Sequence, residues 1–237
     1  MQYHTREVFR NTNTESVKSM KNLFSPDNKF MQLGAKLFDL ISLQIAVMLF
    51  SLPLFTAGAA FTAMHYVLLK IYRDQSTSVW KEFWISFKDN FRQSTVIWLL
   101  SVLIFVFLFV DFRLLAMSEA TWSTGAMYLL LIPVVYLLLG ISWVFVLQSR
   151  YSNTLGTTVK NALATVFAHP FYTIINAVLM IAPLAVLILY FQALPPVFFL
   201  GFTLPGTLRA ILYSRVFDDL EGTDWRKEML IQETTEE

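Results

Sequence analysis

Four long stretches of this chain contain no charged residue, and they decide what the chain can fold into. The stretches are residues 95–110, 126–147, 171–191 and 194–208. Each approaches or reaches the roughly 17–25 residues that a helix needs to cross a hydrocarbon core about 30 Å thick. The whole chain is 56% hydrophobic, against roughly 45–50% for an ordinary soluble domain. The sequence therefore predicts an integral membrane protein that has the lipid bilayer as its first partner.

Residues 37–71 form an apolar segment that is too long for one crossing. A single helix of this length would measure about 52 Å, well over the ~30 Å core. Residues 53–58 lie near its middle and supply a fixed φ, a missing N–H donor and a permissive backbone. We expect a short hairpin with Pro53, Thr56 and Gly58 at its tip. Its arms either cross the membrane twice or dip in and return.

The distribution of Lys and Arg tests this topology, because basic residues accumulate on cytoplasmic segments. With six crossings, seventeen of the eighteen Lys and Arg residues fall on the cytoplasmic side, and Arg113 is the exception. Five crossings would leave one basic terminus outside. The sequence predicts an all-α membrane protein, a bundle of about six transmembrane helices in the cell membrane, multi-pass, with both termini cytoplasmic.

Two basic segments between crossings show helical periodicity, strongly in residues 79–92 and more weakly in residues 155–167. We expect two cytoplasmic interfacial amphipathic helices there, the first with its Trp side chains at headgroup level. The predicted organisation is a cytoplasmic N-terminal segment (residues 1–30), a single transmembrane helical domain (31–217) and an acidic mobile cytoplasmic tail (218–237). The tail has eight acidic residues against two basic ones.

Polar side chains inside a membrane are candidates for function, because an unpaired one is costly there. The candidates are Asp39, His65, Asn176 and Arg209. Snorkelling to the membrane surface accounts for Arg209, and snorkelling or an ion pair with Lys36 accounts for Asp39. His65 could titrate near neutral pH, but a hydrogen bond to a neighbouring helix is the better interpretation. Interhelical hydrogen bonds are also the simplest role of Asn176, Gln44 and Gln192.

The sequence carries no enzyme signature. Cysteine is absent, which excludes thiolate metal sites and Cys nucleophiles. The three histidines are scattered and the eight glycines are spread singly, so neither a metal cluster nor a phosphate-binding loop is expected. We expect a non-enzymatic protein without catalytic, cofactor-binding or metal-binding residues. A formal net charge of +1 gives no bulk attraction to nucleic acid, and the first thirty residues show no signal-peptide pattern.

A small-solute transporter or channel is the alternative. Transporter sites often use helices interrupted by Gly or Pro in corresponding places of two halves. This chain has Pro53 near its first helix and Pro205-Gly206 in its last. The simpler interpretation is that Pro53 ends a helix and Pro205-Gly206 kinks one. The bundle also offers few polar groups to replace the hydration of a solute.

Two sequence patterns point to a family. Residues 53–63 read P-x-x-T-x-G-A-A-x-x-A, and residues 83–91 read F-x-x-x-F-K-x-N-F. With these patterns, and more loosely with Asn161-Ala162 and Leu204-Pro205-Gly206, the chain resembles the YesL-like bacterial integral membrane proteins over about residues 22–220. Where relatives often carry Asn in the first helix, this chain has Gln44. The resemblance implies a partner and no particular reaction, since genes of such proteins often lie beside carbohydrate ABC importers.

The expected function is a non-enzymatic accessory membrane protein of a carbohydrate ABC uptake system. Its partners would be the permease subunits or their ATPase. The candidate partner-binding residues, on the polar face of the first amphipathic helix, are Lys81, Lys88, Asn90 and Arg92. The aromatic residues of the same helix exceed what anchoring needs, although they could equally face lipid.

The predicted topology can be tested with a reporter that is active only in the cytoplasm. Fusions after Arg73, after Ser118 and at the C-terminus should give signal, no signal and signal, because the basic segments flank an even number of crossings. An inactive C-terminal fusion would contradict the six-helix arrangement.

Overall fold

The computed structural model describes residues 29–73, 75, 78–190, 192 and 194–222. These residues contain α-helices, one short 3₁₀ helix and no β-strand. Six helical segments among them are long and apolar enough to cross a membrane. The predicted all-α membrane fold is therefore confirmed. In chain order the elements are α2 (Lys29–Ser51), η1 (Leu54–Thr56), α3 (Ala57–Tyr72), α4 (Val79–Ala116), α5 (Ser123–Arg150), α6 (Leu155–Ala168), α7 (Pro170–Leu189), α8 (Leu194–Leu200) and α9 (Thr203–Glu221).

Packing divides the chain into two compact units, residues 1–41 and residues 42–237. The boundary lies within α2, after the predicted domain start at residue 31. The first unit, where described, is the beginning of α2. The second unit contains the end of α2 and all later elements, and the contacts below belong to it.

The predicted break in the first apolar segment is present, and side chains help to satisfy the backbone groups that it frees. After α2 ends, Pro53 is extended (φ −76°, ψ 102°) and η1 leads into α3. The Thr56 hydroxyl lies 2.7 Å from the Pro53 carbonyl oxygen and also within hydrogen-bond distance of the Phe50 carbonyl. The indole of Trp98 in α4 donates to the Leu54 carbonyl at 2.8 Å. The Pro53 and Leu54 carbonyls also accept backbone bonds from Thr56 and Ala57, so side chains and backbone together satisfy the carbonyls where the helix is interrupted.

Small residues at the start of α3 allow α4 to approach closely. The buried small residues are Ala57, Gly58, Ala59, Ala60 and Ala63. A Cβ at Gly58 would lie 2.6 Å from the Ser94 carbonyl oxygen and 2.6 Å from the Cβ of Trp98. Beside this contact, the hydroxyls of Thr62 and Ser94 share a hydrogen bond of 2.9 Å. Gly58 is therefore required by the contact between two helices, and not by the turn that precedes it.

The helix α4 is continuous over 38 residues, which corresponds to about 57 Å. The amphipathic helix predicted over residues 79–92 is present, but it is the first part of α4 and not a separate helix. The reason is visible in the sequence, because no Gly or Pro occurs between Val79 and Ala116. The second predicted amphipathic helix is the separate α6. It ends at Ala168, and His169 separates it from Pro170 at the first position of α7.

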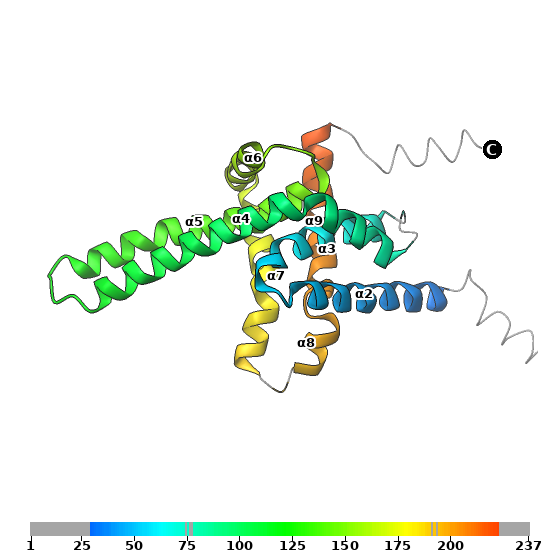
Figure 1. Ribbon diagram of the computed structural model, residues 1–237, viewed down its shortest axis with the longest axis horizontal. Coiled ribbons are helices and arrows are strands. Elements are labelled where there is room, and N and C mark those ends of the chain that lie inside the picture. The colour runs from blue at the N-terminus through cyan, green and yellow to red at the C-terminus, as the bar shows by residue number, and fades with distance from the viewer. Residues whose placement is uncertain (1–28, 74, 76–77, 191, 193, 223–237) are drawn as a thin grey trace, which may run out of the picture. The chain divides into compact units, whose positions relative to one another are not determined.

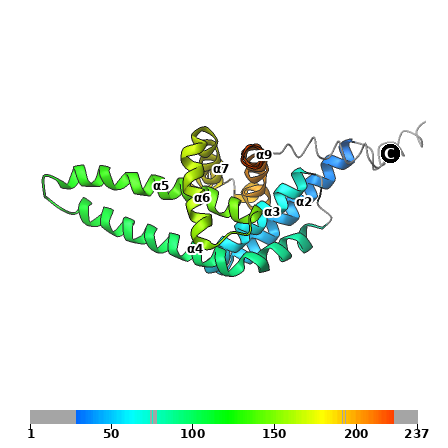
Figure 2. The same ribbon diagram turned by 90° about the horizontal axis from the view of Figure 1, so that it is seen from above.

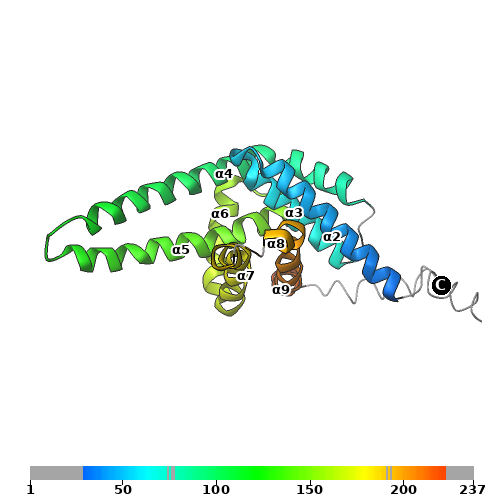
Figure 3. The same cartoon turned by 90° about the horizontal axis from the view of Figure 1, so that it is seen from below.

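Two pairs of helices cross each other in the second unit. α4 and α5 form an antiparallel pair, and α7 and α9 run across it (Figure 1). The views from above and below show the same crossing (Figures 2 and 3). α3 packs against α4, α5 and α9. Of the 18-residue apolar stretch in Leu54–Tyr72, 72% is buried inside the protein, whereas only 11% of the corresponding stretch of α4 is buried. The core therefore lies around α3, and the outer part of the α4–α5 pair leaves apolar surface for lipid.

The last crossing is interrupted at Gly201-Phe202, between α8 and α9. Pro205 lies in the first turn of α9. The N–H that proline lacks would have no acceptor within the helix at this position, so proline is tolerated there. The predicted kink at Pro205-Gly206 is therefore wrong, and the interruption precedes it. The Gln44 Oε1 atom of α2 accepts hydrogen bonds from the backbone N–H groups of Phe202 and Thr203, both at 3.1 Å. This confirms the predicted interhelical role of Gln44.

The helix α9 extends further than the sequence predicts. It continues to Glu221 and is followed by Gly222 in the left-handed conformation (φ 65°), a common helix ending. The predicted start of the mobile tail at residue 218 thus falls inside α9. Residues 223–237 of that tail, and residues 1–28 at the N-terminus, lie outside the described residues.

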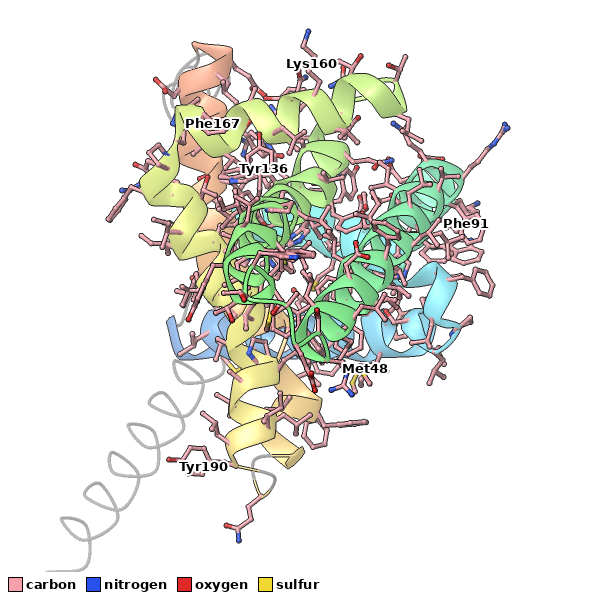
Figure 4. The ribbon with its side chains drawn as sticks, turned by 90° about the vertical axis from the view of Figure 1, so that its left-hand side faces the viewer. Met48, Phe91, Tyr136, Lys160, Phe167 and Tyr190 are labelled. Atoms are coloured by element: carbon pink, nitrogen blue, oxygen red, sulfur yellow. The ribbon has the colours of Figure 1, made fainter. Side chains whose placement is uncertain are left out.

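The helix α6 packs against α5. Its Thr154 cap accepts a hydrogen bond from the Thr157 N–H. Phe167, expected on the apolar face, is 73% exposed, but its ring lies 5.3 Å from that of Tyr136 in α5 (Figure 4). Lys160 points away from the unit (Figure 4).

The close contact at Gly58 predicts that Gly58→Ala destabilises the protein, because the added Cβ meets backbone that cannot move aside. We expect a loss of about 1–3 kcal/mol, measured as a lower midpoint of thermal unfolding in detergent. Gly125→Ala is the matched control, since a Cβ at Gly125 meets nothing within 4 Å. Equal midpoints for the two variants would contradict this role of Gly58.

Candidate functional site

A buried arginine connects three helices of the second unit. Arg209 of α9 is 5% exposed. Its Nε donates to the Asn176 Oδ1 atom of α7 at 2.6 Å, and its Nη2 donates to the Ser142 carbonyl of α5 at 3.2 Å. Snorkelling, predicted for Arg209, is therefore wrong. The helix continues for about three turns beyond Arg209, which places this side chain inside the helical core.

Asn176 completes the connection between α5 and α7. Its Nδ2 donates to the Ser142 carbonyl at 3.0 Å and lies 3.2 Å from the Ser142 hydroxyl. One turn earlier on α7, the Thr173 hydroxyl accepts a hydrogen bond of 2.8 Å from the Trp143 indole. The amide thus uses its donor and its acceptor on two different helices, as predicted for an interhelical partner.

His65 and Tyr213 form a second buried pair. The Nδ1 atom of His65 in α3 lies 3.0 Å from the Tyr213 hydroxyl in α9, and the two side chains are 2% and 0% exposed. Tyr213 follows Arg209 by one helical turn, so α9 directs both side chains toward the same side. The predicted hydrogen bond of His65 to a neighbouring helix is confirmed.

A cavity of about 430 Å³ lies against this cluster. α3, α4, α5, α7 and α9 contribute to its walls, which are mostly aliphatic and aromatic. The lining side chains with polar atoms are His65, Trp98, Ser101 and Arg209. An apolar cavity of several hundred Å³ with a few convergent polar groups is the usual form of a small-molecule site.

Ion pairs gather where α9 ends. Arg150 pairs with Glu221 at 2.9 Å, and Arg73 lies 3.8 Å from Asp218. The Tyr151 hydroxyl also donates to Glu221 at 2.7 Å. Burial, together with this hydrogen bond, raises the pKa of the Tyr151 phenol. The carboxylates predicted to begin a mobile tail therefore connect α9 to the ends of α3 and α5.

The aromatic residues at the start of α4 form one cluster with a buried side and an exposed side. Phe83 and Phe87 are buried and pack on Phe50, with ring centroids 5.4 and 5.0 Å apart. The adjoining side carries exposed aromatic and basic side chains, and its rings continue the same cluster, because Trp84 also contacts Phe50 at 5.4 Å. Phe91 lies 5.5 Å from Phe87, at the outer edge of the cluster (Figure 4). We call this exposed side the aromatic–basic face, and its residues are Trp80, Lys81, Trp84, Lys88, Phe91 and Arg92.

Three of the four predicted partner-binding residues belong to this face. Lys81, Lys88 and Arg92 are exposed, and the Lys88 ammonium lies 5.5 Å from the centre of the Trp84 ring. Asn90 is different, because it is only half exposed and its Nδ2 donates to the Ser86 carbonyl of its own helix at 2.9 Å. The structure thus leaves the three cations available to a partner and uses Asn90 within α4.

The predicted intramembrane residues do not form one group. His65, Asn176 and Arg209 come together, whereas Asp39 is half-buried in the other compact unit and Gln192 is exposed. Sequence reasoning missed Ser142 and Tyr213. Neither residue stands out in the sequence, since serine and tyrosine are ordinary in a membrane helix. The i, i+4 spacing of Arg209 and Tyr213 does indicate that the two side chains lie on one face of the same helix.

The fold and the cavity define a multi-pass, all-α membrane protein with a polar cluster between its helices. Residues 39–112 match a family model described as "Protein of unknown function, DUF624". This segment contains the helix break, the aromatic–basic face and the α4 wall of the cavity. No curated protein and no solved structure matches the chain.

Asn176→Ala should destabilise the protein, because it leaves the Nε–H of a buried cation without an acceptor. We expect a loss of about 1–3 kcal/mol, visible as a lower thermal midpoint in detergent. Gln192→Ala removes an exposed amide and should change the midpoint little. If the Asn176 variant were as stable as the Gln192 variant, Asn176 would not be needed to hold Arg209.

Proposed function

We propose that this protein is a non-enzymatic accessory membrane protein of a carbohydrate ABC uptake system. It would lie in the cell membrane with both termini in the cytoplasm, as the distribution of Lys and Arg indicates. The observation that carries the proposal is the aromatic–basic face of α4, where three cations and three aromatic rings share one exposed surface.

The composition of this face suits a protein partner better than lipid alone. Aromatic residues and Arg are enriched where proteins bind one another, and Trp and Arg are frequent among the residues that dominate binding. Trp84 contacts Phe50, and Phe91 contacts the buried Phe87, so these contacts hold the exposed rings in place before a partner arrives. Such preorganisation lowers the entropic cost of association.

The choice of partner rests on family likeness. We take the DUF624 match over residues 39–112 to be the same likeness as the resemblance to YesL-like proteins. In that family, gene neighbourhoods point to carbohydrate ABC importers. The partner would then be a permease subunit or its ATPase, and carboxylates on its surface would meet Lys88 and Arg92.

Charge reversal tests the proposal. Lys88→Glu with Arg92→Glu should lower co-purification with the permease or its ATPase several-fold, because attraction becomes repulsion at two positions. Insertion and abundance should not change, since both side chains are exposed. The measurement is the amount of partner recovered per amount of tagged protein from membranes.

A matched control separates this face from general surface charge. Lys160→Glu with Arg215→Glu also reverses two exposed cations, on α6 and α9. This control should recover the partner at the wild-type level. Equal losses for both double variants, or no loss for either, would exclude the aromatic–basic face as the docking surface.

A small-solute transporter is the second candidate, and the interrupted helices favour it. The break before α3 and the break before α9 both lie in apolar crossing segments, and Gln44 links α2 to the second. Interrupted helices of this kind surround the substrate sites of many transporters. If purified protein in liposomes moved a sugar or an ion down its gradient, and did so with Lys88 and Arg92 reversed, this candidate would replace the accessory role.

A further inference from the structure

The cavity beside Arg209 has a buried polar end and an exposed apolar end. At the buried end, Met64, His65 and Arg209 are 1%, 2% and 5% exposed. Toward the other end, Phe105 of α4 and Leu184 of α7 line the same cavity and are 44% and 51% exposed. These outer residues belong to helices that are apolar enough to cross a membrane. The mouth therefore faces the lipid.

At the buried end of the cavity, Arg209 has N–H groups that none of the described hydrogen bonds uses. A guanidinium carries five N–H groups, and the described contacts use the Nε–H and one N–H of Nη2. No described carboxylate lies within ion-pair distance of Arg209. A buried cation without an opposite charge is costly, all the more inside a membrane. An anion that reached the cavity would receive the remaining N–H groups in the forked geometry that suits carboxylate and phosphate.

We propose that this cavity binds an amphiphilic anion from the membrane, with one apolar chain and a carboxylate or phosphate head. The head lies at Arg209 beside His65, and the chain lies along the aliphatic walls toward Phe105 and Leu184. A volume of about 430 Å³ is in the range for one small ligand. The site does not depend on the accessory role, because none of the residues of the aromatic–basic face lines it.

The indole of Trp98 on the cavity wall allows a direct measurement. The full-length protein is placed in phosphatidylcholine nanodiscs and titrated with dibrominated stearate, whose bromines quench tryptophan fluorescence on contact. The neutral control is dibrominated stearyl alcohol, which has the same chain. A Trp98→Phe variant identifies the part of the quenching that reports on the cavity.

The acid should quench Trp98 at a concentration at least about tenfold lower than the alcohol, which corresponds to about 1.4 kcal/mol. Arg209→Gln should remove this preference. Arg73→Gln is the matched control, since Arg73 is also buried but lies beside Asp218, away from the cavity walls. The control should keep the preference.

A second variant covers the case in which Arg209→Gln fails to fold. Val102→Phe with Leu138→Phe fills the cavity from its wall and leaves the hydrogen bonds of Arg209 intact. It should lose saturable quenching by the acid. Nanodiscs that contain phosphatidylglycerol identify the source of the anion, because competition there would assign the site to a phospholipid head in place of a free fatty acid.

Three results would overturn the proposal. They are equal quenching by acid and alcohol, an undiminished preference in folded Arg209→Gln, and unchanged acid binding in the filled-cavity variant. Each would leave Arg209 as a structural connection between α5, α7 and α9 alone.

Discussion

Backbone groups freed inside a membrane must find a partner within the protein, and much of this structure follows from that constraint. The hydrocarbon core supplies no water, so each unsatisfied N–H or C=O costs several kcal/mol there. The chain interrupts its apolar segments before α3 and before α9. At the first break, the Thr56 hydroxyl and the indole of Trp98 donate to the carbonyls of Pro53 and Leu54, in addition to the backbone bonds there. At the second, the Gln44 side chain meets the free N–H groups.

The same constraint explains why Arg209 lies where it does. Its bonds go to the Ser142 carbonyl and to Asn176, which itself bonds to Ser142. Three helices therefore share one set of polar atoms, and none of them can shift without leaving a charge unsatisfied. The guanidinium is consequently held in a fixed position on the cavity wall. Because the guanidinium is already fixed, it loses little conformational entropy when it binds an anion, and this preorganisation favours binding.

The sequence predicted the features that depend on local chemistry. The break at Pro53 follows from the backbone limits of proline, and the buried and exposed faces at the start of α4 follow from helical periodicity. The continuity of α4 could also have been predicted, because no residue between Val79 and Ala116 interrupts a helix. The pattern changes from amphipathic to apolar within this one helix, and periodicity alone therefore suggests two helices.

Other features depend on residues far apart in the chain, and a single sequence does not reveal them. α9 runs past residue 217 because Asp218 and Glu221 meet Arg73 and Arg150, which belong to other helices. Without those partners, the acidic composition of the C-terminal segment indicates a mobile tail. The snorkelling expected for Arg209 fails for the same reason, since the distance of Arg209 from the membrane surface depends on where α9 ends. Ser142 contributes chiefly a backbone carbonyl, and residue type carries no information about that.

The helix α4 joins the features that matter most for function. Its first turns carry the aromatic–basic face, Trp98 reaches the break before α3, and Phe105 lines the cavity. From Lys88 to Val102 the distance along the helix axis is about 21 Å, and no Gly or Pro lies between them. Because both lie on one continuous helix, the α4 wall of the cavity and the aromatic–basic face keep a fixed spacing, although none of the residues of that face lines the cavity.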